Sequence, residues 1–190
     1  LGDRLAVAVD EASQGEDLNG DGDEADRIVH LLDHAQQTAT NLGFDASALN
    51  AVGGRLVALR SESESGNDWN SDGDQLDLVF FVWDPVSGVL SNTRVATDGV
   101  ISGSNDSSFL FVVPEVEDRG DRNGDGDTDD RVYALYEFAR PLTIGLGLAA
   151  GSGAGVTQDG AAIFLVSEFA QGRDLNRDGD QVDGILHVRR

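Results

Sequence analysis

The chain has 190 residues, which is enough for one substantial core or a short array of repeats. Acidic residues outnumber basic ones by 35 to 13, and the net charge of −22 argues against a nucleic-acid partner, because phosphate binding needs a basic surface. The absence of cysteine excludes disulfides and thiolate metal sites. No apolar run reaches membrane-spanning length and no signal peptide is recognised, and since the chain begins at Leu1 rather than Met we expect a mature or partial segment of a longer protein.

The first predicted element is an apolar run over Leu5–Val9, which is followed by Glu11 and then by an acidic loop from Asp17 to Asp26. A second apolar run, Ile28–Leu32, comes directly after the loop. Both runs are short and apolar at consecutive positions, which is typical of strands covered on both faces. The sequence therefore predicts a β-hairpin whose connection is the acidic loop.

This succession returns three more times along the chain. The loop pattern D-x-N-x-D-G-D-x-x-D occurs at 17–26, 68–77, 121–130 and 174–183, and its Asn residues lie 51, 53 and 53 residues apart. The flanking apolar runs of the later hairpins are 56–59 with 78–83, 109–113 with 132–136, and 163–166 with 185–188. A period near fifty residues is typical of a propeller or an array. We predict a single β-repeat domain over 1–190, with units at about 1–44, 45–97, 98–149 and 150–190.

Turn residues and weaker strands are expected between the hairpins. Residues 84–88 contain the turn formers Asp, Pro, Ser and Gly, and a more polar stretch follows at 89–96. A small-residue segment, 99–103, then leads into the third hairpin. A complete unit should hold four antiparallel strands: a short inner strand, two apolar strands and a polar outer strand. The first unit lacks its inner strand and the last its outer one.

The loops carry the chemistry expected of a calcium site. Calcium is a hard cation that takes six to eight oxygen ligands, so it needs many carboxylate and carbonyl oxygens within one short loop. Alternating Asp and Asn side chains can point to one side of a tight turn, the following Gly permits a sharp bend, and the last Asp can close the shell. The predicted loop ligands are Asp17, Asn19, Asp21, Asp23, Asp26, Asp68, Asn70, Asp72, Asp74, Asp77, Asp121, Asn123, Asp125, Asp127, Asp130, Asp174, Asn176, Asp178, Asp180 and Asp183.

A glutamate precedes every loop and is a further candidate ligand. In a hairpin it would lie opposite the closing Asp, where two like charges destabilise a sheet unless they share a cation. The other interpretation, a solvated strand end, stays open. These candidates are Glu11, Glu62, Glu115 and Glu168.

The motif is not an EF-hand, because position twelve is Ile28, Val79, Val132 or Ile185 and strands are expected on both sides of the loop. Dockerins and thrombospondin type 3 repeats share only its opening. The loops in their strand context resemble the β-propeller superfamily, in particular FG-GAP-like and bacterial secreted propellers that carry D-x-D-x-D-G calcium loops in a blade hairpin. The resemblance implies an all-β propeller with incomplete terminal blades and about four Ca²⁺ ions, one per loop. Part of a larger ring, or an open array completed by neighbouring molecules, are alternatives.

No residue pattern predicts catalysis. His30 and His187 occupy the repeat position of Phe81 and Ala134, which indicates a structural role, and no serine lies in a nucleophile elbow. The paired carboxylates recur four times, which is the wrong distribution for one active site. Trp83 lies in an apolar run and is expected in the core, whereas Trp69 is the better candidate for stacking on a sugar.

Two functions are therefore considered. The first is a non-catalytic calcium-binding module of a secreted or cell-surface protein that serves as scaffold, adhesin or assembly subunit. The second is a propeller fragment of a secreted glycan-binding or glycan-active enzyme. Possible partners are calcium, a second copy through the incomplete terminal blades, or other surface proteins and glycans; neither a nucleic acid nor a membrane span is expected.

Overall fold

The computed structural model describes residues 2–190, and its regular secondary structure is almost entirely β-strand. No helix among these residues is long and apolar enough to cross a membrane. The first two units contain β1 (Arg4–Asp10), α1 (Glu11–Gln14), β2 (Arg27–Asp33), β3 (Thr38–Asp45), β4 (Ala48–Val52), β5 (Arg55–Ser61), α2 (Glu62–Ser65), β6 (Leu78–Trp83) and β7 (Leu90–Ala96). The remaining strands are β8 (Ile101–Ser104), β9 (Ser108–Pro114), β10 (Arg131–Glu137), β11 (Leu142–Val156), β12 (Ala162–Ser167) and β13 (Gly184–Arg189).

All strand pairs are antiparallel, and the strands follow one another in sequence order. The sheets are β1-β2-β3, β4-β5-β6-β7, and a six-stranded sheet that runs from β8 to β13. The six-stranded sheet combines two units, because β11 pairs with β10 through its first half and with β12 through its second half. Within residues 2–190 the first unit thus has no inner strand and the fourth has no outer one, which matches the pattern expected from the sequence.

The core lies between successive sheets. Each central hairpin is apolar on both faces. In the second and third units, one face packs on the preceding unit and the other on the following one. Three clusters of buried side chains result, centred on Leu56 between the first and second units, on Phe80 and Phe109 between the second and third, and on Tyr133 and Phe164 between the third and fourth. The consecutive apolar runs in the sequence are explained by this two-sided burial.

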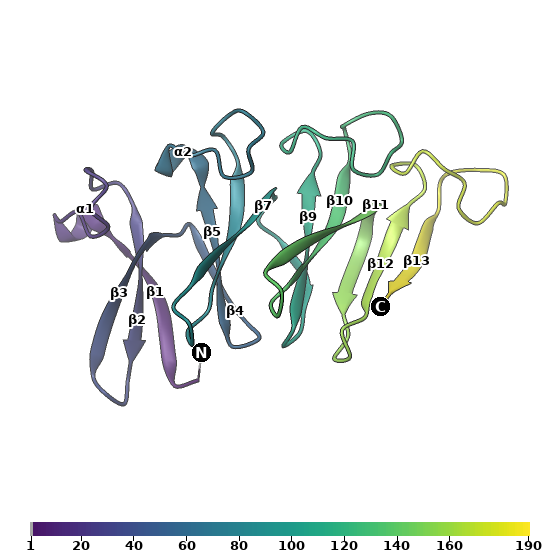
Figure 1. The fold of residues 1–190 in the computed structure, drawn as a ribbon. Coiled ribbons are helices and arrows are strands. Elements are labelled where there is room, and N and C mark those ends of the chain that lie inside the picture. The colour runs from purple at the N-terminus through teal and green to yellow at the C-terminus, as the bar shows by residue number, and fades with distance from the viewer. Residues whose placement is uncertain (1) are drawn as a thin grey trace.

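The four units form an open, propeller-like row rather than a ring. Figure 1 shows the row from the first unit in purple to the fourth in yellow, with the first and last sheets at opposite ends. No strand pairing joins these two sheets anywhere in residues 2–190. The sheets therefore stay open within residues 2–190, and a closed four-bladed propeller is not formed.

Candidate metal centres

All four acidic loops lie along the same long edge of the row, the upper edge in Figure 1. In the first unit β1 ends at Asp10, whose side chain accepts a hydrogen bond from the backbone N–H of Ser13 and so caps the single turn of α1. The turn stops at Gly15, which has a φ of 65°, a conformation favourable to glycine. The chain then enters the loop, and β2 begins at Arg27, directly after the closing Asp26.

The glutamate before each loop is buried completely. Glu11, Glu62, Glu115 and Glu168 all have 0% exposure. The Oε1 atom of Glu11 accepts hydrogen bonds from the backbone N–H groups of Leu18 at 2.6 Å and Asn19 at 3.3 Å, and its Oε2 atom accepts one from Asp26 at 3.2 Å. The interpretation as a solvated strand end is wrong, because the loop amides replace water around the carboxylate.

The same arrangement recurs at the other loops, where residues seven and eight positions after the glutamate donate to its Oε1 atom. The backbone N–H of each glutamate also donates to the carbonyl of the closing Asp, at 2.9 to 3.0 Å. The expected position opposite the closing Asp is therefore confirmed. The glutamate also anchors the loop backbone. In the sequence, only the fixed spacing between glutamate and loop indicates this role.

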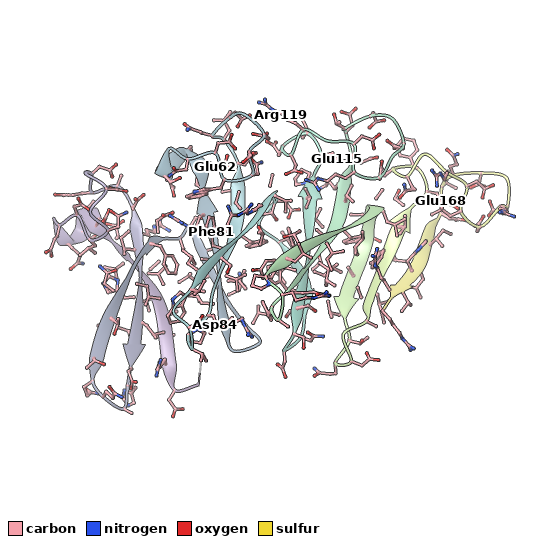
Figure 2. All side chains as sticks on the ribbon, viewed as in Figure 1. Glu62, Phe81, Asp84, Glu115, Arg119 and Glu168 are labelled. Carbon is pink, nitrogen blue, oxygen red and sulfur yellow. The ribbon has the colours of Figure 1, made fainter. Side chains whose placement is uncertain are left out.

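Three carboxylates converge at every loop: the buried glutamate, the Asp at loop position seven and the closing Asp. In each group, one ligand atom per residue lies within 4.8 Å of the others. Figure 2 labels the glutamates of the second, third and fourth groups, which lie along the same edge of the row. Oxygens on opposite sides of one calcium ion lie about 5 Å apart, which is twice the Ca–O distance of about 2.4 Å. The spacing fits a single hard cation. The groups are Glu11, Asp23 and Asp26; Glu62, Asp74 and Asp77; Glu115, Asp127 and Asp130; and Glu168, Asp180 and Asp183.

The third loop has an unpaired acceptor. In the other three loops the closing Asp donates its backbone N–H to the Oε2 atom of the glutamate, at 3.2 to 3.4 Å. The Oε2 atom of Glu115 is buried and has no hydrogen-bond partner. Leaving a buried charged oxygen without a partner is costly, and a cation between Glu115, Asp127 and Asp130 would supply one.

The first, third and fifth loop positions brace the loop itself. Asp17 accepts hydrogen bonds from the backbone N–H groups of Gly20 at 2.6 Å and Gly22 at 3.1 Å, and Asn19 accepts one from that of Asp21 at 3.0 Å. Gly22 has a φ of 108°, so the predicted sharp bend is present. As metal ligands these positions stay predictions.

Burial and mutual repulsion raise the pKa of closing aspartates. Burial, followed by contact with Asp21, raises the pKa of Asp26 to about 6. Burial has the largest effect on Asp77 as well, and with the nearby charges of Asp72 and Glu62 it raises that pKa to about 7, although a hydrogen bond from Asn70 acts in the opposite direction. These sites hold more negative charge than the surroundings stabilise, and a cation would relieve that imbalance.

The second loop also receives a charge from the next unit. The guanidinium of Arg119 donates a hydrogen bond to the backbone carbonyl of Asp72 at 3.1 Å and another to the carboxylate of Asp74 at 2.5 Å. The corresponding residue of the fourth unit is Gly172, so the contact is peculiar to the second loop. The sequence analysis did not identify Arg119 as part of a site, because the residue has no equivalent in the other repeats.

The aromatic candidates are engaged within the protein. The guanidinium of Arg60 lies 4.3 Å from the ring centre of Trp69, and the Phe81 ring packs against the same indole at 4.8 Å. Trp83 is 8% exposed, as expected of a core residue. The imidazole of His187 stacks on Phe164 at 6.0 Å. Arg60 therefore covers one face of the Trp69 indole, and a sugar cannot stack on that face.

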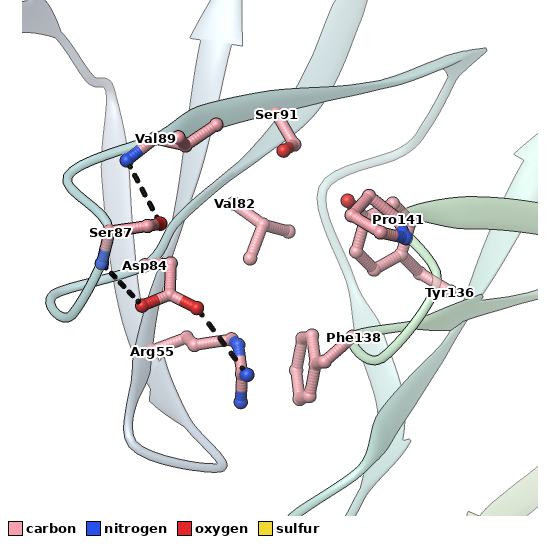
Figure 3. A pocket seen from close by; sticks show the side chains of 9 residues that line it. All are labelled: Arg55, Val82, Asp84, Ser87, Val89, Ser91, Tyr136, Phe138 and Pro141. Carbon is pink, nitrogen blue, oxygen red and sulfur yellow. Dashed lines mark hydrogen bonds and ion pairs between the residues drawn. The ribbon is translucent and has the colours of Figure 1, made fainter.

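A hollow of about 210 Å³ lies between the second and third units, toward the edge of the row opposite the loops (Figure 3). Arg55 and Asp84 form an ion pair at 3.4 Å on its wall, and the guanidinium also packs on the Phe138 ring at 4.7 Å. The buried hydroxyl of Tyr136 has no hydrogen-bond partner. Because the two charges satisfy each other, the hollow presents mainly apolar walls.

Comparison with known proteins gives distant likenesses only. No protein-family model matches the chain, and no curated protein matches it. Among solved structures the chain is similar to TolB from Acinetobacter baumannii, with 13% identity and a TM-score of 0.45 over 98% of this chain and 39% of that one. It is also similar to YjhT, with 13% identity and a TM-score of 0.36 over 89% of this chain and 63% of that one. The chain thus spans less than two thirds of both proteins, and neither likeness assigns an activity.

Proposed function

We propose that this chain is a non-catalytic calcium-binding β-repeat module that holds one Ca²⁺ at each of its four acidic loops. The observation that supports this most is the convergence of three carboxylates at every loop, around a glutamate that has no exposed surface. A buried glutamate is held in one place by loop amides, so it forms a fixed side of the site. The other two carboxylates come from the loop.

Calcium is favoured over other cations by the donor set. Every donor is an oxygen, which excludes a preference for soft metals, and the loops are irregular, whereas magnesium requires rigid six-coordination. With about 2 mM calcium and a dissociation constant of about 0.1 mM, each ion would stabilise the fold by roughly 1.8 kcal/mol. Four ions would contribute about 7 kcal/mol, which is comparable with the whole stability of a domain.

The ion would act as a structural element in this proposal. Each site connects the end of one apolar strand with the start of the next, since the glutamate directly follows the first strand and the closing Asp directly precedes the second. Sites of such modest affinity are filled where calcium is millimolar, so we place the protein outside the cell or at its surface. There it would serve as a scaffold, an adhesin or an assembly subunit.

Calorimetric titration with calcium and thermal unfolding in chelator and in millimolar calcium test the proposal. We expect about four ions per chain and a melting temperature at least several degrees higher with calcium. An unchanged melting temperature would refute the proposal.

Neighbouring residues of the third loop provide a matched pair of variants. Asp130→Asn removes the closing carboxylate, whereas Asp129→Asn removes the same charge at an exposed position outside the carboxylate group. We expect Asp130→Asn to lower the stoichiometry by one ion and Asp129→Asn to leave it unchanged. Equal effects would show that net charge, and not a site, attracts the cation.

A further inference from the structure

The fourth unit presents an apolar sheet face that nothing in residues 2–190 covers. This tail face consists of Ile163, Leu165, Leu186 and Val188. Leu165 pairs with Leu186 and Ile163 with Val188 across β12 and β13, so the four side chains lie on the same side of the sheet. Leu186 is 64% exposed and Val188 is 59% exposed.

The first unit presents a second such face at the other end of the row. This head face consists of Leu5, Val7, His30 and Leu32, with Leu5 paired to Leu32 and Val7 to His30 across β1 and β2. Leu5 is 61% exposed. Both faces belong to strands that are apolar on both sides, although only one side has a neighbour.

The repeat shows what normally covers a tail face. Its four residues stand 53 positions after Leu110, Val112, Tyr133 and Leu135 of the third unit. Those residues pack on the fourth unit, and Leu110, Val112 and Tyr133 are only 0%, 8% and 2% exposed. The tail face is therefore one half of an interface that the protein already forms internally.

The head face is the other half. Leu5, Val7 and Leu32 stand 51 positions before Leu56, Ala58 and Trp83, which pack on the first unit. Leu56 and Ala58 are 1% and 0% exposed at that internal interface. The two ends of the row thus carry complementary halves of the same type of contact.

Each of the two faces also contains a hollow. The tail face is hollowed by about 420 Å³ beside Leu165 and Leu186, where glycines of β11 line the surface, and the head face by about 370 Å³ beside Leu5 and Leu32. Asp33 lines the head hollow. Its carboxylate forms an ion pair with Arg4 of the same unit at 3.5 Å.

We propose that the tail face of one copy packs on the head face of a second copy and reproduces the internal contact between units. This inference rests on the proposed role as an assembly subunit and is independent of the calcium ions. The contact is heterologous, so every added copy leaves one head face and one tail face for the next until a ring closes.

The test is sedimentation velocity over about 5 to 200 µM protein, in calcium and moderate salt that screen the acidic charge. We expect the mass to exceed the 20.1 kDa of one chain and to rise with concentration, either without limit or to the fixed mass of a ring. Leu186→Asp blocks the tail face and Leu5→Asp blocks the head face, so each variant alone should be monomeric. An equimolar mixture of the two variants should form a dimer and grow no further.

Val86→Asp is the matched control, because Val86 is 94% exposed in the turn before β7 and away from both faces. It should assemble like the unmodified chain. Circular dichroism and melting temperature of each variant check that the fold persists, which is expected since both replaced side chains are mostly exposed. A monomeric unmodified chain at every concentration, or a variant that dimerises alone, would overturn the inference. A monomer that still binds about four calcium ions would leave the proposed calcium function intact.

Discussion

Single residues decide how the acidic loops tolerate their own charge. Glu11, Glu62, Glu115 and Glu168 are completely buried in a chain of net charge −22. A buried carboxylate is stable only where hydrogen bonds or a cation replace its water, and here backbone N–H groups of the loop do so. The loop geometry and the glutamate therefore depend on each other.

Replacing Glu62 by Gln tests this dependence. The amide keeps the shape of the side chain, but it loses the negative charge and turns an N–H group toward the backbone donors. We expect the free energy of unfolding to fall by about 1 to 3 kcal/mol, because the backbone N–H of Asp77 loses its acceptor. Urea unfolding measures the change.

The matched control is Glu64→Gln, which removes the same charge from the exposed side of α2 two residues later. Its effect should stay within about 0.5 kcal/mol, as for most surface substitutions. Equal losses in the two variants would contradict the anchoring role.

At the scale of elements, the inner strands depend on close backbone contact. A Cβ atom added at Gly103 in β8 would lie 2.6 Å from the Cα of Gly155 in β11. The third and fourth units therefore approach each other closely where neither residue has a side chain. This contact explains the small-residue segments that precede the apolar runs.

Gly103→Ala should consequently disturb the packing of β8 on β11. We expect a loss of roughly 1 to 3 kcal/mol, because backbone and not a flexible side chain would have to move. Gly145→Ala is the control, since Gly145 lies in β11 with no atom within 4 Å of an added Cβ and without a positive φ. Thermal unfolding of both variants provides the comparison, and a Gly103→Ala protein as stable as the control would contradict the close contact.

At the scale of the whole molecule, the four acidic loops along one edge of the row determine how stability depends on pH. In chelator no calcium is bound to the closing aspartates. The pKa values of Asp26, Asp77 and Asp130 are then raised from 3.8 to about 6, 7 and 6. The folded state then binds more protons than the unfolded state between these limits. The contribution of these three groups to stability is fully present below pH 4 and is lost as the pH rises through 6 to 7.

We therefore expect the melting temperature in chelator to be several degrees higher at pH 5.5 than at pH 8. Repulsion within a chain of net charge −22 acts in the same direction. Millimolar calcium should remove most of the difference, because the ion stabilises the ionised carboxylates, and Asp77→Asn should reduce it in chelator. A melting temperature that rises toward pH 8 in chelator would contradict the raised pKa values.

Much of the fold follows from local patterns. The apolar runs at 28–32 and 78–83 lie within β2 and β6, and the acidic loops connect strands as predicted. The polar stretch at 89–96 and the small-residue segment at 99–103 overlap β7 and β8, whereas the single long strand β11 has no such local signal. Residues 142–156 are rich in glycine, and their extended conformation as one long strand depends on pairing with β10 and β12.

The candidate sites divide in the same way. Fixed spacing within the repeat identified the loops and the preceding glutamates, because a hairpin connection is a local structure. The burial of Glu115, its unpaired oxygen and the contact of Arg119 with the second loop were not predictable, since each depends on atoms brought together by packing.

The sequence by itself determined four acidic loops on four β-hairpins, because strand alternation, turn residues and ligand spacing act over a few residues. The tertiary structure alone decided that the glutamates are buried anchors and that the row stays open with an apolar face at each end. These features arise from how one unit packs on the next. That packing joins side chains that lie some fifty residues apart in the sequence.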